Sequence, residues 1–407
     1  MTAPLPTRPP HAAGGLTTTV LAIAVVVAVV LAGLLAPPTT HAHALEPPPN
    51  GPIEFSPLPG WPSVDDLEAD AFVLVEAATG QVLAGRNAEL RRPVASTVKV
   101  LTALTALQRV DPDEQVTVGE EVAEVGGAGV GLASGDTWTV IDLVTASIAR
   151  SGNEAATALA VHVGGSVEGF VALMREDAAA LGLNGVSLVD PTGLDDDNLL
   201  SASDLVTITR AALDDPVLRG VLQQELVALP SEGVVRSRNL LLGEYPGATG
   251  AKTGYTAAAG YSLIGSADRG ERELIAVVLG MGDDPARFVA ATRLLDLGYD
   301  GFARIALGAV LELAVAGGHA LIEVAPVTVS LPAGETARLA LPLPVRVPDG
   351  DLLVPIEHDG VELGAVPATV SRPDAGTPAG PGSVVGRSAV DGAYAALRAA
   401  AASGVLR

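Results

Sequence analysis

The chain of 407 residues contains no cysteine. This absence excludes a thiol nucleophile, a thiolate metal site and any disulfide bond. Acidic residues outnumber basic ones by 47 to 24, which gives a formal net charge of −23. Such a balance repels phosphate backbones and anionic lipid surfaces, so no nucleic-acid partner is expected. A hydrophobic content of 48% with 17% charged residues indicates a globular protein with a sizeable core.

Histidine is scarce, with six residues in the chain. Three lie near the N-terminus, one at the end of an expected helix and two in a β-rich region: His11, His41, His43, His162, His319 and His358. None accompanies a G-x-S-x-G or H-E-x-x-H sequence. A Ser-His-Asp hydrolase is therefore not indicated, and we expect neither a metal ion nor another cofactor.

Lysine is almost absent, because only two of the 24 basic residues are lysine, Lys99 and Lys252. Arginine serves equally well as a surface charge, but it stays protonated in proteins and cannot act as a base. The two lysines that remain are therefore candidates for chemistry.

The N-terminus carries an apolar run over residues 16–36, after Arg8 and before the small-residue pattern Ala42-His43-Ala44. This order is typical of an export signal, although the run just reaches the length of a membrane span. We expect residues 1–44 to be a signal peptide, with an uncleaved membrane anchor as the alternative, and the remainder to act outside the cytoplasm. Residues 45–69 read as a proline-rich tether.

Residues 70–301 change from strands to helices and back to strands. Strands are predicted over 71–76, 81–86, 250–256, 261–267 and 273–280, and helices over 139–150, 154–163, 167–181, 201–213 and 285–297. This order indicates an α+β catalytic domain in which helices, including a helical subdomain, flank an antiparallel sheet. The glycine-rich segment 126–131 lacks the G-x-G-x-x-G order and is interpreted as a flexible loop.

Beyond residue 301 the pattern changes to short β-like runs separated by glycine and proline. We predict strands over 311–316, 320–329, 336–343 and 351–357, which would form a small all-β domain over residues 302–370. Residues 371–407 read as a Gly/Pro-rich linker and an alanine-rich helix.

The first candidate for chemistry is Ser96, three residues before Lys99 at the start of an apolar helix. The i, i+3 spacing places the hydroxyl next to the ammonium group on one helical face. Burial in this helix would lower the pKa of the lysine, and a neutral amine could then take the proton of the hydroxyl. The pair therefore predicts an activated serine nucleophile.

Two further short motifs carry polar groups suited to the same chemistry. Ser151 and Asn153 lie on a loop between two expected helices and offer a hydroxyl and an amide. Lys252 and Thr253 precede Gly254 at the start of an expected strand, where they could hold an anionic end of a substrate while the glycine allows close approach to the backbone.

Taken in order, S-x-x-K, S-x-N and K-T-G form the signature of penicillin-binding proteins and β-lactamases. With the flanking segments 76–83, 149–156, 190–194 and 250–260, residues 70–301 closely resemble the serine D-alanyl-D-alanine carboxypeptidases, the low-molecular-mass penicillin-binding proteins. The resemblance implies a peptidoglycan stem peptide as the substrate and β-lactam antibiotics as covalent inhibitors.

The resemblance also implies roles for individual residues. Ser96 would be the nucleophile, Lys99 its base and Ser151 a proton relay to the leaving group. Asn153 would contact the substrate amide, and Lys252 and Thr253 would bind its terminal carboxylate. The backbone N–H groups of Ser96 and Tyr255 would form the oxyanion hole. Position 255 is often histidine in this family, so Tyr255 bears on substrate preference more than on activity.

Alternative functions remain at this point. A class A β-lactamase would need a deacylating glutamate between Asn153 and Lys252, and no Glu-x-x-Leu-Asn pattern occurs there. An endopeptidase or a transpeptidase would share the acylation step. A non-catalytic wall-binding protein is disfavoured because all three motifs are intact. Membrane attachment through the N-terminal segment and the oligomeric state are left open.

Overall fold

The computed structural model describes residues 60–371, apart from residues 65, 123–124, 271, 316–317, 340–349 and 360. The predicted signal segment 1–44, the tether as far as residue 59 and the tail from residue 372 lie outside the described residues.

A five-stranded antiparallel sheet, in the order β2-β1-β11-β10-β9, forms the centre of the first domain. Its strands are β1 (Ala71–Glu76), β2 (Val82–Arg86), β9 (Ala248–Thr256), β10 (Gly260–Asp268) and β11 (Glu273–Met281). Both ends of the domain's sequence thus contribute to one sheet, which confirms the predicted α+β class. Every residue of β1 is buried, so both faces of the sheet are covered.

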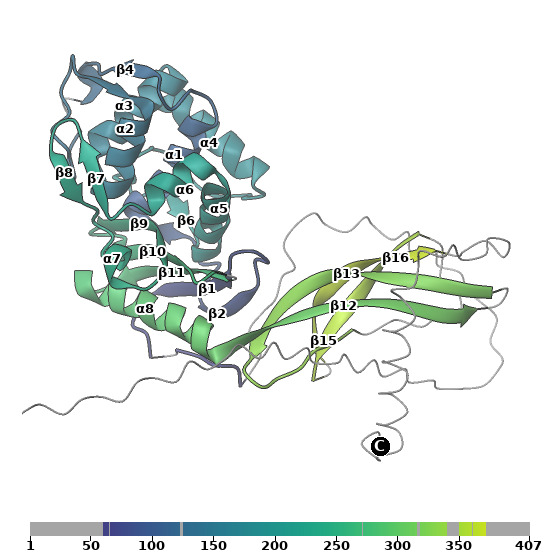
Figure 1. Ribbon diagram of the computed structural model, residues 1–407. Helices are drawn as coiled ribbons and strands as arrows, with labels where there is room; N and C mark the ends of the chain where they lie inside the picture. Colours follow the sequence, from purple (N-terminus) through teal and green to yellow (C-terminus); the bar gives the residue numbers. More distant parts are fainter. Residues whose placement is uncertain are drawn as a thin grey trace, which may run out of the picture.

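Helices cover the two faces of this sheet. α8 (Asp284–Gly301) packs on one face, and a helical subdomain lies on the other (Figure 1). The subdomain contains α1 (Lys99–Leu107), α2 (Val140–Thr145), the π-helical η3 (Ala146–Arg150), α3 (Asn153–Gly164), α4 (Val167–Ala180), α5 (Ala202–Asp214) and α6 (Pro216–Leu222). No single helix in the described part of the chain is long and apolar enough to cross a bilayer; α3 and α4 pass that test only as a pair bent by 84°.

Short elements connect these parts of the first domain. They are β3 (Arg92–Pro93), η1 (Ala95–Val98), β4 (Gln115–Thr117), η2 (Glu120–Val122), β5 (Thr137–Thr139), β6 (Leu199–Leu200), β7 (Leu226–Leu229), β8 (Gly233–Arg236) and α7 (Leu241–Glu244). Among them, the hairpin β7–β8 was not predicted from the sequence.

The C-terminal part of the described chain is a second antiparallel sheet, as predicted, in the order β12-β13-β16-β15-β14. Its strands are β12 (Phe302–Val315), β13 (Gly318–Pro332), β14 (Arg338–Leu339), β15 (Gly350–His358) and β16 (Val361–Ser371). β12 continues directly from the end of α8, and the sheet extends away from the first domain (Figure 1). The strand β16 was missed by the sequence prediction.

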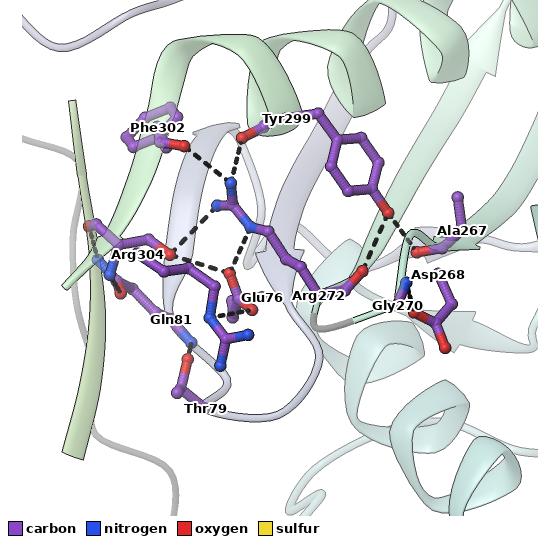
Figure 2. Close-up of polar contacts among 12 residues, drawn as sticks. Glu76, Thr79, Gln81, Ala267, Asp268, Gly270, Arg272, Tyr299, Phe302 and Arg304 are labelled. Carbon is purple, nitrogen blue, oxygen red and sulfur yellow. Dashed lines mark hydrogen bonds and ion pairs between the residues drawn. The ribbon is translucent and has the colours of Figure 1, made fainter. Parts of the chain in front are cut away.

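A buried polar network joins the two domains (Figure 2). Arg272, beside β11, donates from Nε to Glu76 Oε2 at 2.8 Å and from Nη1 to the carbonyls of Gly298 and Phe302 at 2.6 and 2.9 Å. From the second domain, Ser330 donates to the same Glu76 oxygen at 2.9 Å, and its backbone pairs with the side chain of Gln81. The hydrogen bonds fix the orientation of β13 on the central sheet.

We predict that Glu76→Ala lowers the free energy of unfolding by about 3–5 kcal/mol, because it leaves the buried Arg272 guanidinium without its carboxylate. A urea titration followed by Trp61 fluorescence measures this, since Trp61 packs edge-on against Phe302 at the junction. Arg293→Ala is the control: its ion pair with Asp66 is exposed to solvent, so its loss should change the stability little. Equal effects of the two variants would contradict the prediction.

Candidate active site

The first motif folds into a turn that places its two side chains in contact. Ser96 lies in the short 3-10 helix η1, and Lys99 begins α1 directly after it. Lys99 Nζ lies 2.8 Å from Ser96 Oγ, the neighbour relation that the i, i+3 spacing predicts. Lys99 is fully buried, while α1 packs its apolar residues into the core of the helical subdomain. The helix therefore holds an amine in the protein interior beside a hydroxyl.

The surroundings of Lys99 favour the neutral amine. Burial lowers the pKa of Lys99 to about 7; the charges of Asp190 and Glu154 oppose this shift, and that of Arg238 adds to it. A lysine with an unperturbed pKa near 10.4 is almost fully protonated at neutral pH. Here protonated and neutral forms are both populated near pH 7, so the group can accept a proton and return it.

Lys99 has two further hydrogen-bond acceptors that fix its position. Nζ donates to Asn153 Oδ1 at 2.7 Å and to the carbonyl of Thr192. The second motif therefore meets the first through Asn153, at the start of α3. Ser151, two residues earlier, is buried and left-handed at φ 63°, an uncommon conformation for a residue other than glycine that often marks a functional site.

The glycine-rich segment 126–131 is irregular, as predicted, but it is tied to the site rather than free. Asn153 donates from Nδ2 to the carbonyl of Gly126 at 2.7 Å and from its backbone to Ala128 at 2.8 Å. Glu154 Oε1 accepts the backbone N–H groups of Val130 and Gly131 at 2.6 and 3.1 Å. The loop thus helps to orient the amide beside Lys99, a role that was not predicted from the sequence.

The loop 190–194 presses against the turn that carries Ser96. Asp190 Oδ1 accepts from the backbone N–H of Thr192 and of Gly193, which folds the loop on itself. Gly193 has φ +77°, and a Cβ there would lie only 2.8 Å from the backbone nitrogen of Ser96, so glycine is required. This close approach aims the Thr192 carbonyl at Lys99. Before the structure, this loop was known only as one of the segments that carry the family resemblance.

The third motif reaches the site because β9 is the edge strand of the sheet and packs against η1. Lys252 and Thr253 are buried, whereas Tyr255 is 55% exposed. A Cβ on Gly254 would lie 3.0 Å from the Val94 carbonyl oxygen, so this glycine allows the strand to contact the Ser96 turn. That packing role was not anticipated from the sequence.

Three segments far apart in the chain thus meet around the turn that carries Ser96 and Lys99. Comparisons with known proteins identify the family to which such a chain belongs. The model of the D-alanyl-D-alanine carboxypeptidase family matches residues 60–283. The chain belongs to this family. It is accordingly a serine hydrolase with the penicillin-binding-protein fold.

Individual relatives match similar shares of this chain but different shares of their own length. D-alanyl-D-alanine carboxypeptidase DacB2 of Mycobacterium tuberculosis is 36% identical over 245 residues, which cover 58% of this chain and 84% of that protein. DacF of Bacillus subtilis is 33% identical over 57% of this chain, and the match spans 62% of the relative's own length.

Two solved structures extend the comparison to the fold. Penicillin-binding protein 6B of Escherichia coli is 28% identical, with a TM-score of 0.64 over 78% of this chain and all of the other. Streptomyces K15 DD-transpeptidase is 27–28% identical, with a TM-score of 0.54 over 57% of this chain and 98% of the other. The first comparison thus extends beyond the catalytic domain predicted over residues 70–301.

The second lysine of the site, Lys252, lies among other basic groups. Burial lowers the pKa of Lys252 well below its usual value, and the charges of Lys99, Arg238 and Arg287 add to this shift. Lys252 Nζ donates to the Thr253 carbonyl at 3.0 Å. An anion bound here would restore the charged form of Lys252, so the pocket favours a negatively charged ligand.

Arg238 is the site residue that the sequence did not single out. Its backbone N–H donates to the carbonyl of Ala149 at 2.9 Å, close to Ser151 in the chain, and its charge acts on both Lys99 and Lys252. No hydrogen bond or ion pair is described for its guanidinium within residues 60–371. Arginine is frequent throughout this chain, so composition alone gave no signal for it.

Proposed function

We propose that this protein is an exported serine D-alanyl-D-alanine carboxypeptidase that removes the terminal D-alanine from peptidoglycan stem peptides and is acylated by penicillin. The observation that carries the proposal is the buried Lys99, with a pKa of about 7, at 2.8 Å from Ser96 Oγ. A serine beside a neutral amine is equipped for acyl transfer without histidine or a metal ion.

In the acylation step, Lys99 takes the proton of Ser96 as Oγ attacks the carbonyl carbon of the penultimate D-alanine. The backbone N–H groups of Ser96 and Tyr255 stabilise the negative charge that develops on the carbonyl oxygen. Ser151 passes a proton to the departing amine, and terminal D-alanine leaves. Water then hydrolyses the ester on Ser96, with Lys99 again acting as the base.

Substrate binding in this proposal depends on the carboxylate of the terminal D-alanine. Thr253 offers a hydroxyl, Arg238 offers a positive charge, and Lys252 regains its charge when the carboxylate binds. Asn153, held by Gly126 and Ala128, presents its amide to the peptide bond of the substrate. Tyr255 stacks on Tyr261 with ring centroids 4.3 Å apart and forms an exposed aromatic wall beside Gly254.

The direct test is release of D-alanine from a synthetic stem pentapeptide by the purified protein, with Ser96→Ala as the comparison. Activity that depends on Ser96 supports the proposal. Failure of the wild-type protein to release D-alanine, with Ser96→Ala behaving in the same way, would overturn it and favour a non-catalytic wall-binding role.

Transpeptidation is the second candidate, and the structural likeness to Streptomyces K15 DD-transpeptidase favours it. Both reactions share the Ser96 acyl-enzyme and differ only in whether water or an amine removes the acyl group. Adding an amino-acid acceptor to the same assay separates them, because a transfer product appears only if the amine competes with water.

We predict that Arg238→Gln raises KM about tenfold for a substrate with a free terminal carboxylate, because one charge-assisted contact is lost. A substrate amidated at its C-terminus should bind weakly to both proteins and show almost no difference. Steady-state kinetics with the two substrates measures the effect. A matched control is Arg219→Gln, whose guanidinium pairs with Glu273 instead. Equal losses on both substrates would refute a carboxylate-binding role.

A further inference from the structure

Two turns at one end of the β domain bring an imidazole and two carboxylates together. Glu335 lies in the turn after β13, His358 ends β15, and Asp359 begins the turn towards β16 with φ 49°. One oxygen or nitrogen of each side chain lies within 4.8 Å of the other two. None of these residues takes part in the reaction proposed above, so the cluster is separate from the active site.

The orientation of His358 is fixed by a backbone contact. Its side chain is 93% buried, and Nδ1 lies 2.9 Å from the carbonyl oxygen of Thr336. Because a carbonyl can only accept, Nδ1 carries the proton, and in the neutral ring Nε2 keeps its lone pair. In metal sites, a hydrogen bond of this kind from the other ring nitrogen to a backbone carbonyl orients the histidine that binds the metal.

The other ring nitrogen has no short partner. Nε2 faces Glu335 Oε2 across 3.9 Å, which is too long for a hydrogen bond. When the ring is neutral, Nε2 and Glu335 Oε2 are both hydrogen-bond acceptors, and they face each other. The His358 side chain that carries Nε2 is nine-tenths buried. A cation between them would satisfy both atoms.

We infer that Glu335, His358 and Asp359 form a binding site for a divalent transition-metal ion, with Zn²⁺ as the best fit. Zn²⁺ binds imidazole nitrogen and carboxylate oxygen at about 2.0–2.2 Å, so two of its ligands lie somewhat under 4 Å apart. Ca²⁺ and Mg²⁺ prefer oxygen ligands alone. The exposed carboxylates of Glu335 and Asp359 can move by the small distance that the ion requires. Water would complete the coordination.

The expectation that the chain binds no metal rested on the absence of a ligand motif. Glu335 and His358 are separated by a β-strand and by residues outside the described part, so their spacing matches no motif. Only the pairing of β14 with β15, which joins Arg338 to Glu357, brings the two turns together. The metal would therefore link two turns of the β domain in a structural role.

The proposed metal site lies beside a tryptophan whose fluorescence can report metal binding. The rings of Trp61 and His358 are 6.4 Å apart between centroids, and Trp61 in turn contacts Phe302 at the domain junction. The other tryptophan, Trp138, is on β5 in the helical subdomain. A paramagnetic ion such as Co²⁺ held by His358 should therefore quench the fluorescence of Trp61.

The full-length protein is titrated with Zn²⁺, followed by calorimetry, and with Co²⁺, followed by tryptophan fluorescence. We expect one Zn²⁺ per chain, and quenching by Co²⁺ that excess Zn²⁺ reverses. Glu335→Gln and Asp359→Asn should each weaken binding by at least roughly 10- to 100-fold, which is the cost of losing a group that only orients a metal ligand. Both side chains are exposed, so these variants should fold even if His358→Gln does not.

Two controls make the result specific. His162→Gln removes a histidine that also pairs with a carboxylate, Glu114, at 3.0 Å but lacks a third ligand, and it should retain full binding. The double variant His41→Ala/His43→Ala removes the histidine pair near the N-terminus and should also retain it. Absence of Zn²⁺ binding up to millimolar concentration, or binding that survives in Glu335→Gln and Asp359→Asn, would overturn the inference. The readout is independent of D-alanine release.

Discussion

Ser96→Ala should abolish covalent labelling by penicillin and reduce D-alanine release by about 10⁴-fold or more, because the atom that forms the acyl-enzyme is missing. The wild-type protein should gain the mass of one penicillin molecule, and the labelled peptide should contain Ser96. Intact-protein mass spectrometry after mixing, followed by peptide mapping, measures both effects. The alanine variant should remain folded, since Ser96 is a partly buried residue in a short turn.

The lifetime of the adduct distinguishes between the enzymes that share this fold. Glu154 is the acidic residue beside Asn153, but Val130 and Gly131 occupy its Oε1. These bonds tie Glu154 to the 126–131 segment, and no Glu-x-x-Leu-Asn pattern supplies a deacylating glutamate, so we expect the penicilloyl adduct to persist. A matched control is Ser166→Ala, which removes the N-cap of α4 outside the site and should label normally. Free wild-type enzyme regenerated within seconds would favour a β-lactamase instead.

The parts of the site that could be predicted are those in which residue type and spacing determine geometry. Ser96 and Lys99 meet because an i, i+3 pair shares a helical face. Outside the site, the helix predicted over 201–213 is observed as α5, and Ser201 and Asp204 form a local capping box at its start. Lys252 was found because lysine is so rare in this chain. In each case the residue types and their spacing in the sequence are enough to predict the contact or the role.

The contacts that escaped prediction are made by backbone atoms or by long-range packing. Lys99 bonds the carbonyl of Thr192, and any residue could supply that oxygen. The segment 126–131 is ordered by Asn153 and Glu154 through main-chain groups, which leave no residue signature. The glycines at 193 and 254 are explained only by the chain that passes close to them.

Missed elements of secondary structure have a similar cause. α6 has seven residues, too few for its helical period to be recognised, although Asp215 caps it and Pro216 begins it. β16 contains Gly364 and Pro367, which interrupt the alternating pattern of a strand. Its pairing with β15, from Gly350 to His358, outweighs these unfavourable local preferences.

Lys99→Arg should reduce the rate of acylation by about 10²- to 10⁴-fold, the range that a positioned general base contributes. Arginine keeps the positive charge of the site but cannot give up its proton, so Ser96 loses its base. The rate constant for acylation by saturating penicillin, measured by stopped flow, is the appropriate quantity. Arg109→Lys, a change of the same kind in the ion pair with Asp177 outside the site, is the control.

The acylation rate of the wild-type protein should increase with pH as Lys99 loses its proton. The base must be neutral, and burial lowers the pKa of Lys99 to about 7, so the wild-type rate should rise about tenfold per pH unit below 7 and level off above it. A lysine with its usual pKa would still gain rate up to about pH 10. The residual activity of Lys99→Arg should lack the step near pH 7. Two results would assign the proton transfer to another group: a wild-type rate that stays flat from pH 5.5 to 8.5, or an arginine variant whose rate is within tenfold of wild type. Ser151 would then be the first group to test, because it lies two residues before Asn153, which bonds Lys99 directly.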